Sequence, residues 1–215
     1  MEQHIKKIKS IVIYLVCFIF VGTLVYKQFI QIQNIFDQMF YTRIKSYSFS
    51  NMQQIKPLSR DEESNYTSDG DYRNEYKKEY LSEGESLIIT FDRNNKNMEI
   101  IAVKRFNEFR IVFRYTYDIK TKKLTETIGC RYGELYSGEF NQYSEDYKEH
   151  TENLQEILLI IEKSGLTKED LLQYKKYFLY DKLLTDWSDA NFSRFSANRW
   201  GKVEYTEVLP LENSK

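Results

Sequence analysis

An uncharged apolar segment near the start of the chain constrains its structure more than any other feature. Residues 11–26 contain no charged side chain, and only Gly22 and Thr23 are neither apolar nor aromatic. As an α-helix, residues 11–30 would reach about 30 Å, the thickness of a bilayer's hydrocarbon core. The positive-inside rule would keep the preceding lysines in the cytoplasm, namely Lys6, Lys7 and Lys9. The segment therefore predicts an uncleaved, single-pass signal anchor with the rest of the chain outside the cell.

Two other interpretations of this segment are open from the residues alone. A cleaved signal peptide has a shorter apolar region, followed by small residues at the cleavage site. Here the bulky residues 26–29 follow instead. A buried core helix would seldom contain so long an uncharged run at the very terminus. We favour the anchor, which predicts a cytoplasmic tail (1–10), a transmembrane helix (11–30) and an extracytoplasmic domain (31–215), localised at the cell membrane.

The charge of the chain is unevenly distributed. The whole sequence has a net charge of −1, but the part beyond residue 27 has 27 basic and 31 acidic residues and a net charge of −4. No run of Lys or Arg longer than a pair occurs there, so nucleic acid is not an expected partner. The two cysteines, Cys17 and Cys130, provide neither a disulfide framework nor a cysteine metal site.

The sequence of the domain predicts an α+β fold. Four runs rich in β-branched and aromatic residues alternate in polarity and are separated by short turns, which predicts an antiparallel meander of about four strands. Apolar residues at intervals of three and four predict helices before and after this meander, and a Thr167–Asp170 cap begins the last one. The predicted strands are 86–92, 98–106, 109–118 and 124–132, with a further strand at 202–208; the predicted helices are 29–43, 153–164 and the segment after 167.

A polar, turn-rich stretch at residues 50–70 predicts a long loop. Tyr72, Tyr76 and Tyr80 follow it at intervals of four, which on a helix would form one aromatic stripe. Aromatic residues make up 16% of the chain, and exposed tyrosines beside loop carboxylates suit a binding surface. The candidate partner-binding residues are Asp61, Glu62, Glu63, Tyr66, Asp69, Asp71, Tyr72 and Tyr76.

The sequence shows no catalytic motif. HExxH, the P-loop and GxGxxG are absent, and His4 and His150 are the only histidines. The residues around Gly70 fall short of the spacing of a calcium-binding EF-hand loop. We therefore expect no enzymatic activity, no cofactor and no metal.

Three stretches of the sequence carry a family resemblance: residues 37–58, 123–138 and 162–187. They resemble the TipC family of immunity proteins from streptococci and related Gram-positive bacteria. The resemblance implies a membrane-anchored protein that binds and neutralises a cognate LXG toxin exported by type VII secretion. Such a toxin hydrolyses the wall precursor lipid II outside the membrane, so the immunity protein protects the producer and its siblings in interbacterial competition. The family supplies no catalytic residues.

Two alternatives to a toxin-binding protein are open. A membrane-anchored sensor or ligand-binding domain would need a pocket for its ligand. An extracytoplasmic hydrolase would need convergent carboxylates in a cleft.

Overall fold

The computed structural model describes residues 2–42, 51–55, 72–92, 95–132 and 149–207. Their strands form one eight-stranded mixed sheet, in which β1 to β7 follow each other in chain order and β8 pairs with β6. All pairings are antiparallel except that of β8, which lies parallel to β6. The strands are β1 (Met52–Ile55), β2 (Tyr72–Tyr76), β3 (Glu85–Asp92), β4 (Asn97–Arg105), β5 (Phe109–Asp118), β6 (Lys123–Tyr132), β7 (Glu149–Thr151) and β8 (Glu204–Glu207).

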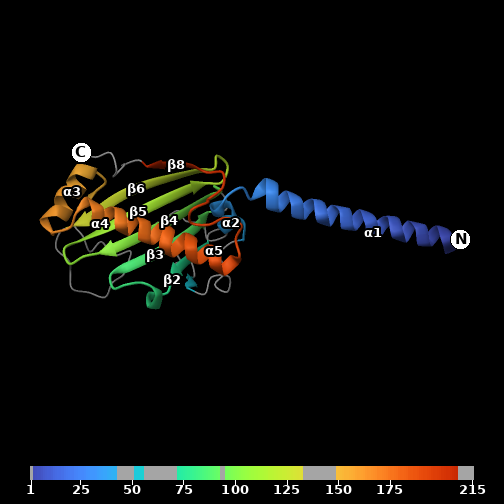
Figure 1. Cartoon of the computed structure of the whole chain (residues 1–215), viewed down its shortest axis with the longest axis horizontal. Helices are drawn as coiled ribbons and strands as arrows, with labels where there is room; N and C mark the ends of the chain where they lie inside the picture. The colour runs from blue at the N-terminus through green and yellow to red at the C-terminus, as the bar shows by residue number, and fades with distance from the viewer. Residues whose placement is uncertain (1, 43–50, 56–71, 93–94, 133–148, 208–215) are drawn as a thin grey trace, which may run out of the picture.

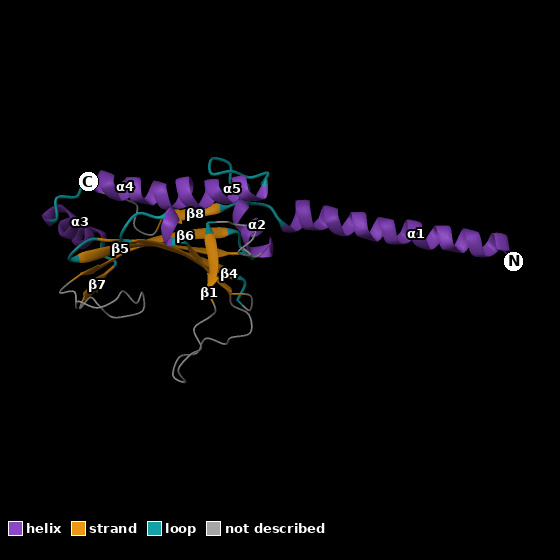
Figure 2. Ribbon diagram, turned by 90° about the horizontal axis from the view of Figure 1, so that it is seen from below, coloured by secondary structure: helices purple, strands orange, loops and turns teal. Residues whose placement is uncertain are grey.

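The helices cover one face of this sheet. Helix α2 and the consecutive segments α4, η3 and α5 pack there, with α3 at the far end (Figures 1 and 2). Helix α1 instead leaves the domain as a separate rod (Figure 1). The bounds are α1 (Glu2–Val25), η1 (Tyr26–Gln31), α2 (Ile35–Thr42), η2 (Lys78–Tyr80), α3 (Leu154–Lys163), α4 (Lys168–Lys176), η3 (Tyr177–Leu184) and α5 (Thr185–Asn191), where η1 and η3 are π-helical and η2 is a 3-10 turn.

The core lies between the sheet and these helices. Because side chains alternate along a strand, Phe113, Tyr115 and Tyr117 of β5 all face the helices and are fully buried. The ring of Phe113 lies 6.4 Å from that of Phe178 in η3. Trp187 of α5 is also fully buried. One layer of helices on one sheet face thus accounts for the hydrophobic core.

Several predictions from the sequence are confirmed. The strands β3 to β6 form the expected meander, with continuous registers between neighbours. The helix expected at 153–164 is α3, and the expected last strand is β8. Thr167 and Asp170 form a capping box at the start of α4, as the spacing indicated. The α+β class is therefore correct.

The predicted sheet itself is wrong in size and pairing. It has eight strands rather than about four, and the parallel strand β8 makes it mixed. The missed strands β1, β2 and β7 are only three to five residues long and rich in polar residues, so they lack the apolar alternation that reveals a strand. The expected helical stripe is also wrong, because Tyr72 and Tyr76 belong to strand β2.

The predicted transmembrane anchor is contradicted. In the parts of the chain that the structure describes, no helix is both long and apolar enough to cross a membrane. The prediction assumed an α-helix as far as residue 30, whereas the regular helix ends at Val25 and the backbone continues as the π-helical turn η1. The uncharged α-helical part, residues 11–25, spans about 22 Å, short of the roughly 30 Å required. The single-pass anchor and the cell-membrane localisation derived from it were therefore wrong.

A buried polar cluster fastens the start of the domain to the end of the sheet. Asp37 of α2 is fully buried and accepts hydrogen bonds from Lys122 Nζ at 2.6 Å and from the Tyr117 hydroxyl at 2.9 Å. Asn34 caps α2 through its side-chain oxygen, which accepts from the backbone N–H of Asp37 at 2.8 Å. Its amide nitrogen donates to the carbonyl of Lys202 at 2.7 Å. These bonds hold α2 against the β5–β6 turn.

Candidate functional site

The sheet has a second face, opposite α2 to α5, which we call the open face. Within the described residues, none of these helices lies on it (Figure 2). The alternation along the strands places Ser86 of β3, Val103 of β4, Val112 of β5 and Gly129 of β6 there, and strand register puts them in one row. The row therefore crosses four strands.

A row of arginines lies next to these residues. Arg105, Arg110 and Arg131 are cross-strand neighbours on β4, β5 and β6. Arg110 is only 4% exposed. Like charges directly opposite each other in a sheet repel, so three arginines in register are unusual across neighbouring strands. Further along the face, Arg114 forms an exposed ion pair with Glu99 at 3.1 Å, which contributes little to stability.

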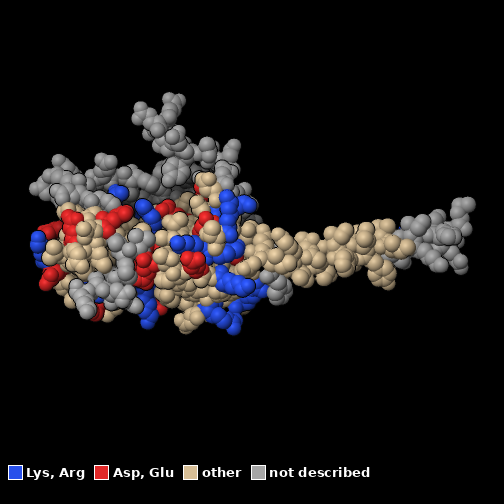
Figure 3. All heavy atoms as spheres, turned by 90° about the horizontal axis from the view of Figure 1, so that it is seen from above, with Lys and Arg blue, Asp and Glu red and all other residues tan. Residues whose placement is uncertain are grey.

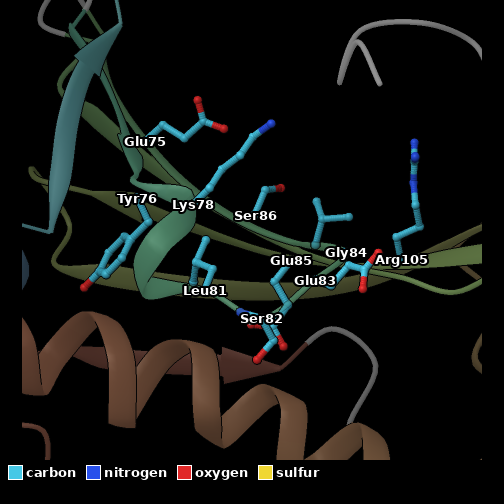
Figure 4. Close-up of a pocket in the computed structure, with 11 residues that line it drawn as sticks. Glu75, Tyr76, Lys78, Leu81, Ser82, Glu83, Gly84, Glu85, Ser86 and Arg105 are labelled. Carbon is cyan, nitrogen blue, oxygen red and sulfur yellow. Dashed lines mark hydrogen bonds between the residues drawn. The ribbon is translucent and has the colours of Figure 1, made fainter. Parts of the chain in front are cut away.

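A hollow of about 680 Å³ lies where β2, η2, the start of β3 and the end of β4 meet; its lining residues are 75, 76, 78, 81–86, 103 and 105. In Figure 4 the side chains of Glu75, Lys78, Ser86 and Arg105 point to one side of the strands, and those of Tyr76 and Leu81 point toward the helix. The hollow therefore adjoins the open face at the end that carries the arginine row.

Glu85 is a carboxylate of the hollow with several partners, one of which is the backbone N–H of Ser82 at 2.9 Å. Its Oε1 atom lies 3.0 Å from Lys104 Nζ, and its Oε2 atom accepts from the Tyr177 hydroxyl at 3.1 Å. Burial, together with the negative charge of Glu85, raises the pKa of Tyr177 to about 12. The tyrosine is therefore a stable donor at neutral pH, and Glu85 is fully occupied in joining η3 to the sheet.

Two polar groups of the hollow lack partners in the part of the chain that the structure describes. The hydroxyl of Ser86, only 7% exposed, has no hydrogen-bond partner there. The exposed Lys78 makes no ion pair with any described side chain. A buried hydroxyl without a partner costs about 1–3 kcal/mol, so Ser86 is a polar group that the packing of the described residues leaves unsatisfied.

The rim of the hollow depends on a glycine. Gly84 has a φ of +75°, and a Cβ there would lie 2.9 Å from the backbone oxygen of Arg105. The backbone N–H of Arg105 donates to the carbonyl of Gly84 at 2.7 Å. The close approach and the left-handed conformation both favour glycine at this position, where the end of β4 lies against the rim of the hollow.

The structure does not bring the residues predicted from the sequence together. Asp61, Glu62, Glu63, Tyr66, Asp69 and Asp71 lie outside the described residues, as does the side chain of Tyr72. Tyr76 is 1% exposed and its hydroxyl donates to Asp186 of α5 at 3.0 Å. Burial raises the pKa of Tyr76 well above its usual value, and the charge of Asp186 adds to the shift. Tyr76 is therefore a core residue that joins β2 to α5.

Sequence reasoning missed Lys78, Ser86 and Arg105. None belongs to a motif, and they come from a turn and two strands. The only available signal was alternation: Ser86 and Arg105 occupy positions of their strands opposite to the apolar Leu87 and Ala102.

A second cluster of titratable groups lies beneath the helices. Lys175 of α4 lies 3.1 Å from Glu126 of β6 and 2.5 Å from Glu207 of β8. Tyr205 donates a hydrogen bond to Glu126. Burial raises the pKa of Glu126; burial opposes the charge of Lys175, but the hydrogen bond to Glu207 and the charge of Glu126 raise its pKa. Every charged group has a partner, so the cluster is an ion network that fastens β8 and α4 to β6.

No group of three or more His, Cys, Asp and Glu side chains that could hold a metal ion occurs among the residues that the structure describes. His150 belongs to strand β7, and the only cysteine in the core, Cys130, is fully buried. Burial raises the pKa of the Cys130 thiol to about 12, which makes it a poor nucleophile.

Comparison with known proteins agrees with this architecture. A family model described as TipC immunity protein-like matches residues 7–207. The structure of TipC2 from Streptococcus intermedius B196 is similar, with a TM-score of 0.62 and 18% sequence identity over 82% of this chain and 96% of that chain. At this identity the likeness shows the fold alone. No curated protein sequence matches the chain.

Proposed function

Because the chain belongs to the TipC immunity protein-like family, we propose that it confers immunity by binding and neutralising a cognate secreted protein toxin. The family assignment covers residues 7–207, which include the whole sheet and all the helices that pack on it. An immunity function therefore belongs to the domain as a unit. Beyond this immunity function, we propose the identity of the toxin and the way in which it is neutralised.

The proposed toxin is an LXG protein exported by type VII secretion that attacks lipid II. This choice is supported by the resemblance carried by residues 37–58, 123–138 and 162–187. Neutralisation is proposed to be stoichiometric, by occlusion of the toxin rather than by a reaction.

The observation that best supports protein binding is the difference between the two sheet faces. One face is occupied by α2 to α5 (Figure 2), while the other carries Arg105, Arg110 and Arg131 on neighbouring strands and adjoins a hollow of about 680 Å³. Arginine is one of the residues that most often dominate the energetics of protein interfaces. A sheet face with a hollow at one end suits a protein partner that places a protruding loop in it.

The test uses the full chain and the toxin encoded beside it. We expect a 1:1 complex by size-exclusion chromatography with light scattering, and normal growth of sensitive cells that express both proteins. A catalytically inactive toxin variant is the matched control, since it should form the same complex without affecting growth. If the wild-type pair forms no complex and the chain gives no protection, the proposed function is wrong.

A further inference from the structure

The ion network beneath α4 contains two carboxylates and one cation. Lys175 Nζ lies 3.1 Å from Glu126 of β6 and 2.5 Å from Glu207 of β8. Neither carboxylate pairs with a second Lys or Arg among the residues that the structure describes. A buried charge without compensation is unfavourable, so the addition of one proton, which brings the total charge of the network to zero, would stabilise it.

Of the two carboxylates, Glu126 is the better proton acceptor. Its side chain is 3% exposed, against 18% for Glu207, so water stabilises the charge of Glu126 less. Burial raises the pKa of Glu126, although the hydrogen bond from Tyr205 and the charge of Lys175 oppose this rise. An added proton is therefore expected on Glu126.

Tyr115 of β5 offers a partner for a protonated Glu126. The two residues are directly opposite each other on neighbouring strands, and the side chain of Tyr115 is fully buried. Its hydroxyl has no hydrogen-bond partner among the described residues. Burial raises the pKa of Tyr115 well above its usual value, and the charge of Glu126 adds to the shift. A carboxylate only accepts hydrogen bonds, whereas a carboxylic acid can also donate one to a tyrosine oxygen.

The other titratable groups that face this pair are Lys175 of α4, Tyr205 and Glu207 of β8, and Tyr180 of η3. Burial raises the pKa of Tyr205 well above its usual value, and tyrosines are uncharged at mildly acidic pH. Lysine keeps its charge there. The carboxylates alone can therefore change the charge of this network when the pH falls slightly below neutral.

We propose that Glu126 takes up a proton at mildly acidic pH and that this proton tightens the attachment of β8 to β6, so that the junction is a pH-sensitive element of the fold. Strand β8 pairs with β6 over only four residues, Glu204 to Glu207. In the unfolded chain Glu126 is exposed and loses its proton at an ordinary pH, whereas the folded state holds it to a higher pH. The resulting stability is present at low pH and is lost as the pH rises through the folded-state value.

The test follows urea unfolding of the full chain by circular dichroism at about pH 5 and about pH 8. Glu126→Gln is the variant, because the amide has nearly the same shape and does not titrate. The unfolding equilibrium constant of the wild type, divided by that of Glu126→Gln, should rise more than about threefold from the lower to the higher pH. Glu204→Gln is the matched control: it removes a carboxylate of the same strand whose side chain is 70% exposed, and the corresponding ratio should stay constant.

Carboxyl-carbon NMR of the wild type gives an independent readout that needs no variant. The resonance of Glu126 should titrate at a higher pH than that of the exposed Glu204. If Glu126 titrates at the same pH as Glu204 or below it, or if the ratio of unfolding constants for Glu126→Gln does not change with pH, the inference is wrong. If Glu126→Gln does not fold, the NMR titration alone decides. Neither measurement involves the toxin, so a failure here leaves the proposed function unaffected.

Discussion

At the residue scale, Gly201 makes the tightest backbone contact among the described glycines. A Cβ at this position would lie 2.3 Å from the backbone oxygen of Gln33 and 2.7 Å from Cε1 of Phe195. The isolated bridge between Asn34 and Gly201 joins the segment before α2 to the loop after α5. The contact therefore belongs to the same junction that buries Asp37, and a side chain at residue 201 would separate its two strands of backbone.

Gly201→Ala should lower the free energy of unfolding by more than about 2 kcal/mol, because steric overlap adds to the cost of a positive φ. Gly165→Ala is the matched control. Gly165 has a similarly positive φ, +78° against +94°, but nothing lies within 4 Å of its added Cβ. It should therefore lose only about 1 kcal/mol, the conformational cost alone. Urea unfolding followed by circular dichroism measures both values, and equal losses would show that the contact at Gly201 is unimportant.

At the element scale, β8 is held by charge as well as by backbone pairing. Lys175 is 8% exposed and lies between Glu126 and Glu207. Removing one member of a buried ion network leaves the others without compensation. The same strand also packs through Tyr205, whose ring lies 5.6 Å from that of Trp200.

Lys175→Met should lower the free energy of unfolding by about 3 kcal/mol, because two carboxylates then face each other without their cation. Lys176→Met, an exposed neighbour on the same helix, should change it by less than about 0.5 kcal/mol. Chemical denaturation of the two variants provides the comparison. Equal effects would mean that Lys175 does not hold the network together.

Sequence patterns correctly predicted the elements whose apolar residues recur with the spacing of a strand or of a helix, but not of both. The alternation of Phe109 to Tyr117 is compatible with a strand alone, and β5 lies where it was expected. Tyr72 and Tyr76, in contrast, are four residues apart, and a separation of four places two side chains on one face of a helix and of a strand alike. The pairing of Tyr72 with Phe91 decides between the two, and that contact is not local in sequence.

At the scale of the whole molecule, one end of the domain is positively charged because distant segments of the chain meet there. Lys and Arg side chains gather at the end of the domain from which α1 leaves (Figure 3). The exposed Lys120, Arg199 and Lys202 come from the β5–β6 turn and the loop after α5. The net charge of −4 beyond residue 27 averages this positive end with acidic regions, so a count along the chain could not reveal it.

The candidate site was equally inaccessible to the sequence. The acidic loop residues were chosen because carboxylates and tyrosines stand close together at 61–72. The hollow instead combines residues from 75 to 105, brought together by the pairing of β3 with β4. The signature of the site is the partnerless hydroxyl of Ser86, which becomes visible only when burial and hydrogen bonds are known.

The central claim, that the open face binds the toxin, is tested most directly by hydrogen–deuterium exchange of the full chain with and without the toxin. The account predicts that binding slows exchange at η2, the start of β3 and the end of β4, the elements that form the hollow. Exchange in α3 and α4, on the opposite face, should not change. Slower exchange confined to the helices, with η2 and its neighbours unaffected, would contradict the account.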